Sequence, residues 1–177
     1  MKEGDILWYC DSARKSPDSV ERFLELVHKS KSGILVYPQT TSQGKATKAD
    51  VFLAAKMDIH QLQDYPQLFA GTFFLQKRGK DCDAEKLILE WLRLCQVPGL
   101  IDDSPSKSTN TNKFYASSFK HDQAVFSLLA YKHGAYVLQE DSEIHFTRKE
   151  ASRNIMYRFK QLKENFVTQI KDAISHL

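Results

Sequence analysis

The chain has 177 residues, of which 42% are hydrophobic and 27% are charged, and its formal net charge is +3. This composition excludes a mainly disordered chain, and the small charge excess argues against a dedicated nucleic-acid binder, which needs a concentrated basic face. No run of residues approaches the roughly 18 apolar positions of a membrane-spanning helix, and the polar start lacks the apolar core of a signal peptide.

The first part of the chain predicts two strands with a helix between them. Ile6–Cys10 is a short apolar run that ends at Asp11, which is typical of a buried strand with an acid at its tip. Ser16 and Pro17 supply a cap and a first-turn proline for a helix whose apolar face continues to Val27. Residues 34–37 then predict the second strand.

The middle of the chain predicts a loop, a helix start and a strand. Residues 38–44 are polar and indicate a loop, and Thr47 and Asp50 have the spacing of a capping box, with Asp in place of the usual Glu. Residues 68–75 are aromatic and apolar, which favours one buried strand. Gly71 inside this strand indicates that something approaches the backbone closely.

The second half predicts two helices, a long loop and a short strand. A helix begins near Ala84 with apolar residues at helical spacing, and another begins at His121 and is closed by Gly134. Between them, residues 98–112 form a loop whose length is typical of functional or mobile segments. Residues 135–138 predict a strand. Strands that alternate with helices indicate the α/β class.

A last helix is predicted from about Lys149 to the end of the chain. One face is apolar and the other is basic, so the helix either packs on the body of the protein or contacts a membrane surface or a partner. The basic side consists of Arg148, Lys149, Arg153, Arg158, Lys160, Lys163 and Lys171.

Asp11 is the first candidate for chemistry. Open α/β sheets bind ligands at the carboxyl ends of their strands, and a carboxylate there suits a divalent cation that bridges diphosphate oxygens. The alternative is an ordinary turn or cap residue.

His121, Asp122 and Gln123 form the second candidate group. The first turn of a helix offers free N–H groups and a partial positive charge, and adjacent Asp and Gln side chains can bind several sugar hydroxyls. The alternative is that Asp122 only caps or charges the helix.

Two further groups have equally plain alternatives. Ala70, Gly71 and Thr72 would let a ligand lie against the backbone, or they form a bulge beneath the core. Asp102 and Asp103 could be a paired-acid site, or they belong to an exposed turn.

The cysteines bear on the cellular compartment. Cys10, Cys82 and Cys95 are odd in number and form no C-x-x-C pair, which argues against a disulfide framework or a structural zinc site. We therefore expect a reducing, cytoplasmic environment.

Taken in order, six segments resemble a group of bacterial glycosyltransferase-like proteins with a GT-A type nucleotide-diphospho-sugar transferase fold. The resemblance covers residues 4 to 138. The segments are residues 4–13 (GDILWYCDSA), 47–52 (TKADVF), 70–77 (AGTFFLQK), 90–92 (EWL), 100–106 (LIDDSPS) and 119–129 (FKHDQAVFSLL).

This resemblance implies a partial GT-A-like domain over residues 1–147, a mixed sheet flanked by helices, followed by the basic amphipathic helix over 148–177 on the same domain. It implies transfer of a sugar from a nucleotide-sugar donor to a glycan acceptor in polysaccharide biosynthesis, with no nucleic-acid partner. Asp122 and Gln123 would be catalytic. Asp11 would hold Mn²⁺ or Mg²⁺. The implied substrate-binding residues are His121, Ala70, Gly71, Thr72, Asp102 and Asp103.

The sequence departs from this family in two places. Tyr9 replaces the first acid of the D-x-D pattern, which weakens the expectation of a metal. The family also carries a nucleotide-binding half before the first strand, so we expect a fragment, a shortened relative, or a second chain that completes the site. The alternative function is an inactive sugar- or partner-binding module. The last helix gives the option of a peripheral position at the inner membrane face.

Overall fold

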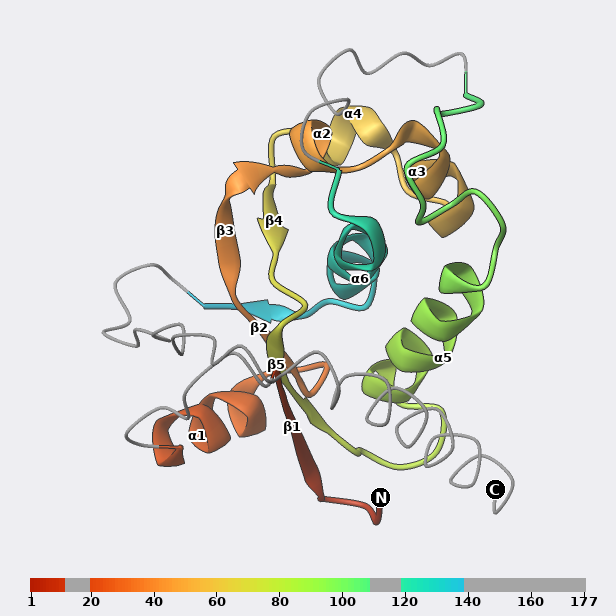
Figure 1. Cartoon of the computed structure of the whole chain (residues 1–177). Helices are drawn as coiled ribbons and strands as arrows, with labels where there is room; N and C mark the ends of the chain where they lie inside the picture. The colour runs from red at the N-terminus through yellow and green to blue at the C-terminus, as the bar shows by residue number, and fades with distance from the viewer. Residues whose placement is uncertain (12–19, 109–118, 139–177) are drawn as a thin grey trace, which may run out of the picture. The chain divides into compact units, whose positions relative to one another are not determined.

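A four-stranded mixed sheet organises the computed structural model, which describes residues 1–11, 20–108 and 119–138 (Figure 1). The strand order is β1-β5-β2-β6. Both β1 (Ile6–Cys10) and β2 (Ile34–Val36) pair antiparallel with β5 (Thr72–Gln76), whereas β6 (Tyr136–Val137) runs parallel to β2. Helices flank this mixed sheet, which confirms the α/β class.

The central strand β5 is covered on both faces, and all five of its residues are buried. Phe73 belongs to the main hydrophobic core, whereas Phe74 stacks on Phe23 of α1 (Glu21–Lys29) and on Trp8 of β1, with ring centroids 5.2 and 5.5 Å apart. Successive side chains of a strand point to opposite faces. A strand buried on both faces therefore needs the continuous apolar run seen here.

Helix α6 (His121–Lys132) lies at the centre of the core and contacts α5 (Asp83–Cys95), α3 (Ala49–Ala55), α2 (Gln43–Ala46) and β4 (Pro66–Leu68). Residues 124–130 are all buried. A helix with neighbours on every side is apolar all round, which explains why this stretch has no polar face. The predicted starts of α5 and α6 are confirmed to within one residue.

The polar segment 38–44 is not a loop. Residues Pro38–Ser42 form β3, which pairs antiparallel with β4 in a separate two-stranded sheet, and α2 follows directly. The loop prediction was wrong because it weighed polarity alone. The pairing partner of β3 lies more than 20 residues further along the chain.

The predicted strand over residues 68–75 is two strands. β4 ends at Leu68 and β5 begins at Thr72, and the residues between them carry the chain from the two-stranded sheet to the four-stranded sheet. The prediction was wrong because an apolar run shows burial but not a change of sheet. Gly71 lies at this bend.

The predicted capping box is also absent. Helix α3 begins after Lys48 without a side-chain cap, and the Thr47 hydroxyl donates instead to Gln43 Oε1 at 3.0 Å. The Asp50 carboxylate accepts the backbone N–H groups of Lys107 and Ser108, each at 2.9 Å. Long-range contacts thus replace the local cap.

Three sequence predictions fall partly or wholly outside the described residues: the helix start at Ser16 and Pro17, the end of the loop over 98–112 from residue 109 on, and the last helix. Helix α1 is described from Glu21 and ends at Lys29, before Gly33, and α4 (Ile59–Leu62) is a short helix that follows α3. Among residues 1–11, 20–108 and 119–138, no helix has both the length and the apolar character to cross a bilayer.

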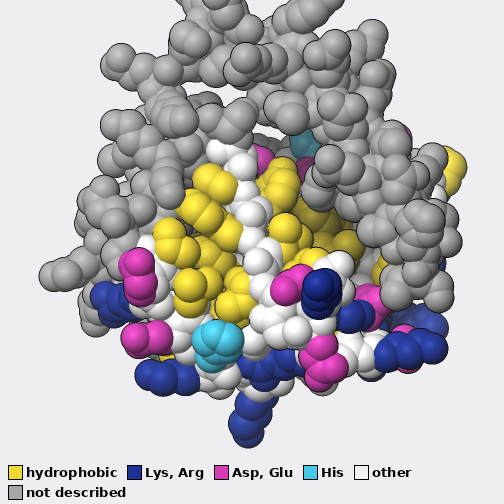
Figure 2. Space-filling model, turned by 90° about the horizontal axis from the view of Figure 1, so that it is seen from below, with side chains coloured by type: hydrophobic (Ala, Val, Ile, Leu, Met, Phe, Trp, Pro, Cys, Tyr) yellow, Lys and Arg dark blue, Asp and Glu magenta, His cyan; other side chains and the backbone are white. Residues whose placement is uncertain are grey.

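Figure 2 shows hydrophobic side chains gathered on the lower face of the molecule, with side chains of both charges around them. Lys and Arg lie among Asp and Glu on this face and form no continuous basic surface.

Candidate functional site

The end of β1 meets the bend between β4 and β5 at Asp11 and Gly71. The backbone N–H of Asp11 donates to the Gly71 carbonyl at 2.8 Å, and the Tyr9 hydroxyl donates to Asp11 Oδ1 at 2.9 Å. A Cβ at position 71 would lie 2.7 Å from Asp11 Oδ2 and 2.2 Å from the ring of Phe69. The missing side chain of Gly71 therefore makes room for the Asp11 carboxylate.

Thr72 ties the two strands together at the same place. Trp8 Nε1 donates to the Thr72 hydroxyl at 3.0 Å, and this hydroxyl donates to the Tyr9 carbonyl, also at 3.0 Å. Thr72 is 1% exposed, so its side chain is engaged inside the protein. Ala70 beside it is also buried. The side chains of Ala70 and Thr72 are therefore not available to a ligand, and the space beside Gly71 is taken up by the Phe69 ring and the Asp11 carboxylate.

Gln123 reaches the bend from the first turn of α6. Its amide nitrogen donates to Gln39 Oε1 at 3.1 Å and to Gln67 Oε1 at 2.9 Å, while its Oε1 faces the Ala70 N–H at 3.5 Å. Both N–H groups of the amide are therefore used by the protein, and a ligand would find only acceptor capacity on Oε1. This arrangement makes Gln123 a positioning group for the bend.

A buried polar network continues from Gln123 into the core. Gln67 donates to the Ala46 carbonyl at 3.4 Å, and Gln43 donates to the hydroxyl of Ser127, which in turn accepts the Leu68 N–H at 2.6 Å. Gln43, Gln67 and Ser127 are fully buried, so each bond replaces one lost to water. The network fastens β4 to α6 beneath the bend.

Asp122 lies one residue before Gln123 and is exposed. Its backbone carbonyl accepts a hydrogen bond from Trp91 Nε1 at 3.0 Å, and no side chain caps α6.

Burial raises the pKa of Tyr9, and the charges of Asp11 and then Asp122 raise it further. Burial likewise raises the pKa of Cys95 to about 12, with a contribution from Asp122. The carboxylates of Asp11 and Asp122 therefore act on the same phenol.

The other predicted residues form a second group around the segment 99–108. Asp102 accepts hydrogen bonds from the hydroxyl and the N–H of Ser104, which lower the pKa of Asp102, as does the Lys48 ammonium 3.6 Å from Asp102 Oδ1. Asp103 contacts His121, with Oδ1 2.9 Å from Nε2. Asp102 thus makes the polar turn named above as the alternative, and Asp103 pairs with the first residue of α6.

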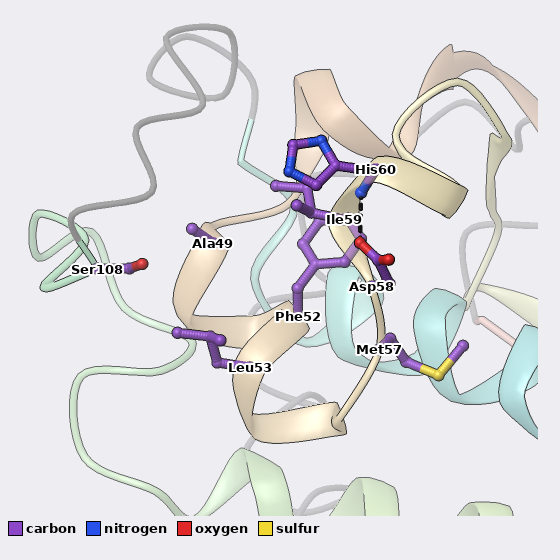
Figure 3. A pocket seen from close by; sticks show the side chains of 8 residues that line it. All are labelled: Ala49, Phe52, Leu53, Met57, Asp58, Ile59, His60 and Ser108. Carbon is purple, nitrogen blue, oxygen red and sulfur yellow. Dashed lines mark hydrogen bonds between the residues drawn. The ribbon is translucent and has the colours of Figure 1, made fainter.

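A pocket of about 170 Å³ lies beside α3 and α4, away from the predicted site residues (Figure 3). Apolar side chains from α3 and the α3–α4 turn make most of its wall, and Asp58 at its rim caps α4 by accepting the His60 N–H at 2.8 Å. None of the nine predicted site residues lines it. The lining residues are Ala49, Phe52, Leu53, Met57, Asp58, Ile59, His60 and Ser108.

Among residues 1–11, 20–108 and 119–138, no group of three or more His, Cys, Asp or Glu side chains is arranged to hold an ion. Mg²⁺, however, is commonly held by one or two carboxylates together with substrate phosphates. Asp11 is a single carboxylate, so a metal ion there would require that shared mode.

Several important residues escaped the sequence reasoning. Gln39 and Gln67 hold Gln123, Trp91 holds the start of α6, and Lys48 holds the segment 99–108. The sequence around Gln39, Gln67 and Lys48 gives no sign that these polar side chains make long-range contacts inside the protein. The helical spacing of the α5 sequence predicts Trp91 on the apolar face, but not its hydrogen bond to the start of α6.

Comparison with known proteins gives no relative: no family model, no curated protein and no solved structure matches this chain. Function is therefore argued from the geometry of the candidate site, defined as Asp11, Gly71, Asp122 and Gln123.

Gly71→Ala should displace the Asp11 carboxylate while costing only about 1–3 kcal/mol of stability, because the new Cβ meets two movable side chains and no backbone. The expected structural change is loss of the Tyr9–Asp11 hydrogen bond, seen as a shifted Tyr9 ring signal in NMR spectra. Gly4→Ala is not a suitable control, because Gly4 has a φ of +89°. Ala70→Gly, which removes a Cβ from the adjacent position, should leave that ring signal in place. An unchanged Tyr9 signal in Gly71→Ala would contradict the close approach.

Proposed function

We propose that this chain is a GT-A-like glycosyltransferase domain that transfers a sugar from a nucleotide-sugar donor to a glycan acceptor, in the cytoplasm. One observation carries the proposal: three segments distant in sequence bring Asp11, Gly71 and Gln123 together at the carboxyl end of β1. Because β1 is an antiparallel edge strand, the proposal rests on the Asp11 carboxylate itself as an oxygen ligand for a diphosphate-bound cation.

Asp11 is the residue that would bind the donor. Its Oδ1 accepts from Tyr9, which orients the carboxylate, and its Oδ2 lies against Gly71 at the position that a Cβ would need. A divalent cation there, Mn²⁺ or Mg²⁺, would neutralise the charge of the leaving diphosphate. Tyr9 stays a neutral phenol and a hydrogen-bond donor, because burial and two nearby acids raise its pKa.

Asp122 and His121 are the groups available to sugars. Both are exposed at the start of α6, and the Asp122 carboxylate has no hydrogen bond to another described side chain. A free carboxylate accepts hydrogen bonds from two sugar hydroxyls, and an imidazole adds a third contact. The exposed first turn of α6 is therefore the sugar-binding part of the proposal, whereas Gln123 positions the bend.

The experiment is a thermal-shift screen of nucleoside diphosphates and nucleotide sugars, with and without Mn²⁺. A ligand at about 100 times its dissociation constant should stabilise the wild type by about 2.7 kcal/mol. Asp11→Ala should remove the part of this shift that depends on Mn²⁺, and Asp64→Ala, at an exposed acid on another part of the chain, should retain it.

Two outcomes would contradict the assignment. If no nucleoside diphosphate stabilises the wild type, with or without Mn²⁺, donor binding by this chain is wrong. Stabilisation by oligosaccharides alone would instead favour the inactive sugar-binding module. Nucleotide binding that appears only when another protein is added would favour a second chain that completes the site.

A further inference from the structure

Lys48 is a buried cation with an unusual set of partners. It is 3% exposed, and its ammonium donates to the carbonyls of Gly99 (3.4 Å) and Asp102 and pairs with the Asp102 carboxylate at 3.6 Å. The same nitrogen lies 4.6 Å from the centre of the Phe119 ring. Burying a charge is costly unless the charge is fully paired, so these contacts offset the cost of burying the Lys48 ammonium. In return, the ammonium fixes the positions of its partners.

The partners of Lys48 flank a carboxylate–imidazole pair. Asp102 precedes Asp103, and Phe119 stands two residues before His121. Asp103 Oδ1 lies 2.9 Å from His121 Nε2, and the Phe119 ring packs edge-on against the imidazole with centroids 5.1 Å apart. One ammonium therefore contacts both the segment that carries the acid and the ring against which the imidazole packs.

The backbone around this pair is also fixed. Asp50, two residues after Lys48, accepts the N–H groups of Lys107 and Ser108, so the segment 99–108 is attached at both ends to the start of α3. The Lys120 N–H donates to the Ala46 carbonyl at 3.1 Å. His121 itself has a φ of +48°, which a residue with a Cβ adopts only when its surroundings enforce it.

We infer that Lys48 is a positioning residue that sets the Asp103–His121 pair, so that the neutral imidazole carries its proton on Nε2 and presents Nδ1 as an acceptor. A carboxylate accepts and cannot donate when ionised, so its partner nitrogen must carry the hydrogen. Nδ1 has no hydrogen bond to any residue in the described ranges. This last step rests on the proposed function: Nδ1 accepts a hydrogen bond from a hydroxyl group of the glycan acceptor.

The test is the imidazole N–H signal of His121 in NMR spectra of the full chain without any sugar or nucleotide, assigned with His121→Gln. The His121 and Asp103 side chains are 49% and 92% exposed, so the spectra are recorded in the cold, where an N–H held by the carboxylate exchanges more slowly than a free imidazole N–H. We expect the signal in the wild type, its loss in Asp103→Ala and Lys48→Met, and its partial return in Lys48→Arg.

The chain offers matched controls. His133 Nε2 lies 3.1 Å from Glu90 Oε2 near the other end of α6, and its signal should persist in every variant. Lys86→Met, at an exposed lysine of α5, should leave both signals unchanged. Because no ligand is added, a failed nucleotide screen leaves this result intact, and the two proposals fail separately.

Persistence of the His121 signal in Asp103→Ala would overturn the pair. Persistence in Lys48→Met, with the His133 signal present, would overturn the role of Lys48. If Lys48→Met unfolds and the His133 signal is lost as well, Phe119→Leu decides the role of Lys48. It removes the ring but keeps the lysine and its carbonyls, so a weakened His121 signal supports the inference and an unchanged one contradicts it.

Discussion

Replacing Phe126 with alanine should lower the free energy of unfolding by about 3–5 kcal/mol. Phe126 is fully buried in the middle of α6 and stacks on Phe73 of β5, with ring centroids 4.7 Å apart. Its ring also lies 5.0 Å from that of Trp91 on α5. Truncation removes this shared contact and leaves a cavity where a helix, a sheet and a second helix meet.

The effect should extend to the candidate site. Phe73 stacks on Tyr9 with centroids 4.9 Å apart, and Tyr9 orients Asp11 through its hydroxyl. Trp91 holds the Asp122 carbonyl at the start of α6. The cavity therefore borders Phe73 and Trp91, through which the core contacts Tyr9 and the start of α6, and Phe126→Ala should weaken any nucleotide-dependent stabilisation as well as the fold.

Unfolding in urea, followed by circular dichroism, measures this change. Leu89→Ala is the control, because Leu89 on α5 is 45% exposed and its truncation should cost no more than about 0.5 kcal/mol. A loss below about 1.5 kcal/mol for Phe126→Ala would mean that α6 does not pack against β5 as described. A total stability of about 5–15 kcal/mol makes the expected loss easy to detect.

The fold could be predicted where the local pattern and the final environment agree. The strand β2 and the helical spacing of α5 are confirmed, because β2 is buried throughout and α5 buries one face. The strand β1 was predicted correctly, but its burial was not: it is an edge strand with no fully buried residue. β3 was missed because its Gln and Thr side chains resemble a loop until β4 is placed beside it. The break after Leu68 was missed because both strands are buried and look alike in sequence.

The candidate site likewise contains features that the sequence predicts and contacts that it does not. Asp11 at the tip of β1 and the start of α6 at His121 are local features, and the sequence predicts them. The meeting of Asp11 with Gly71 depends on the register of β1 against β5, where Cys10 pairs with Thr72. The burial of Lys48 depends on Phe119, 71 positions later in the printed sequence. No spacing rule reaches across such distances, so these contacts needed the structure.

Asp122→Asn should reduce sugar transfer by about 100-fold or more, on the proposed function, while changing stability by less than about 1 kcal/mol. The Asp122 side chain is exposed and caps no helix, so its removal costs only its favourable charge interaction with the start of α6. Asparagine has nearly the same shape but lacks the negative charge. Loss of activity would then report the charge itself.

The measurement pairs a transfer assay, using a donor identified by the thermal-shift screen, with thermal unfolding of each variant. Asp83→Asn is the matched control: Asp83 is a first-turn acid of α5, so it loses the same type of helix interaction away from the candidate site. It should keep full activity. Equal loss in both variants would attribute the effect to helix charge. A stability loss above about 2 kcal/mol in Asp122→Asn alone would assign Asp122 to the fold and remove it from the proposed chemistry, because helix charge alone contributes less.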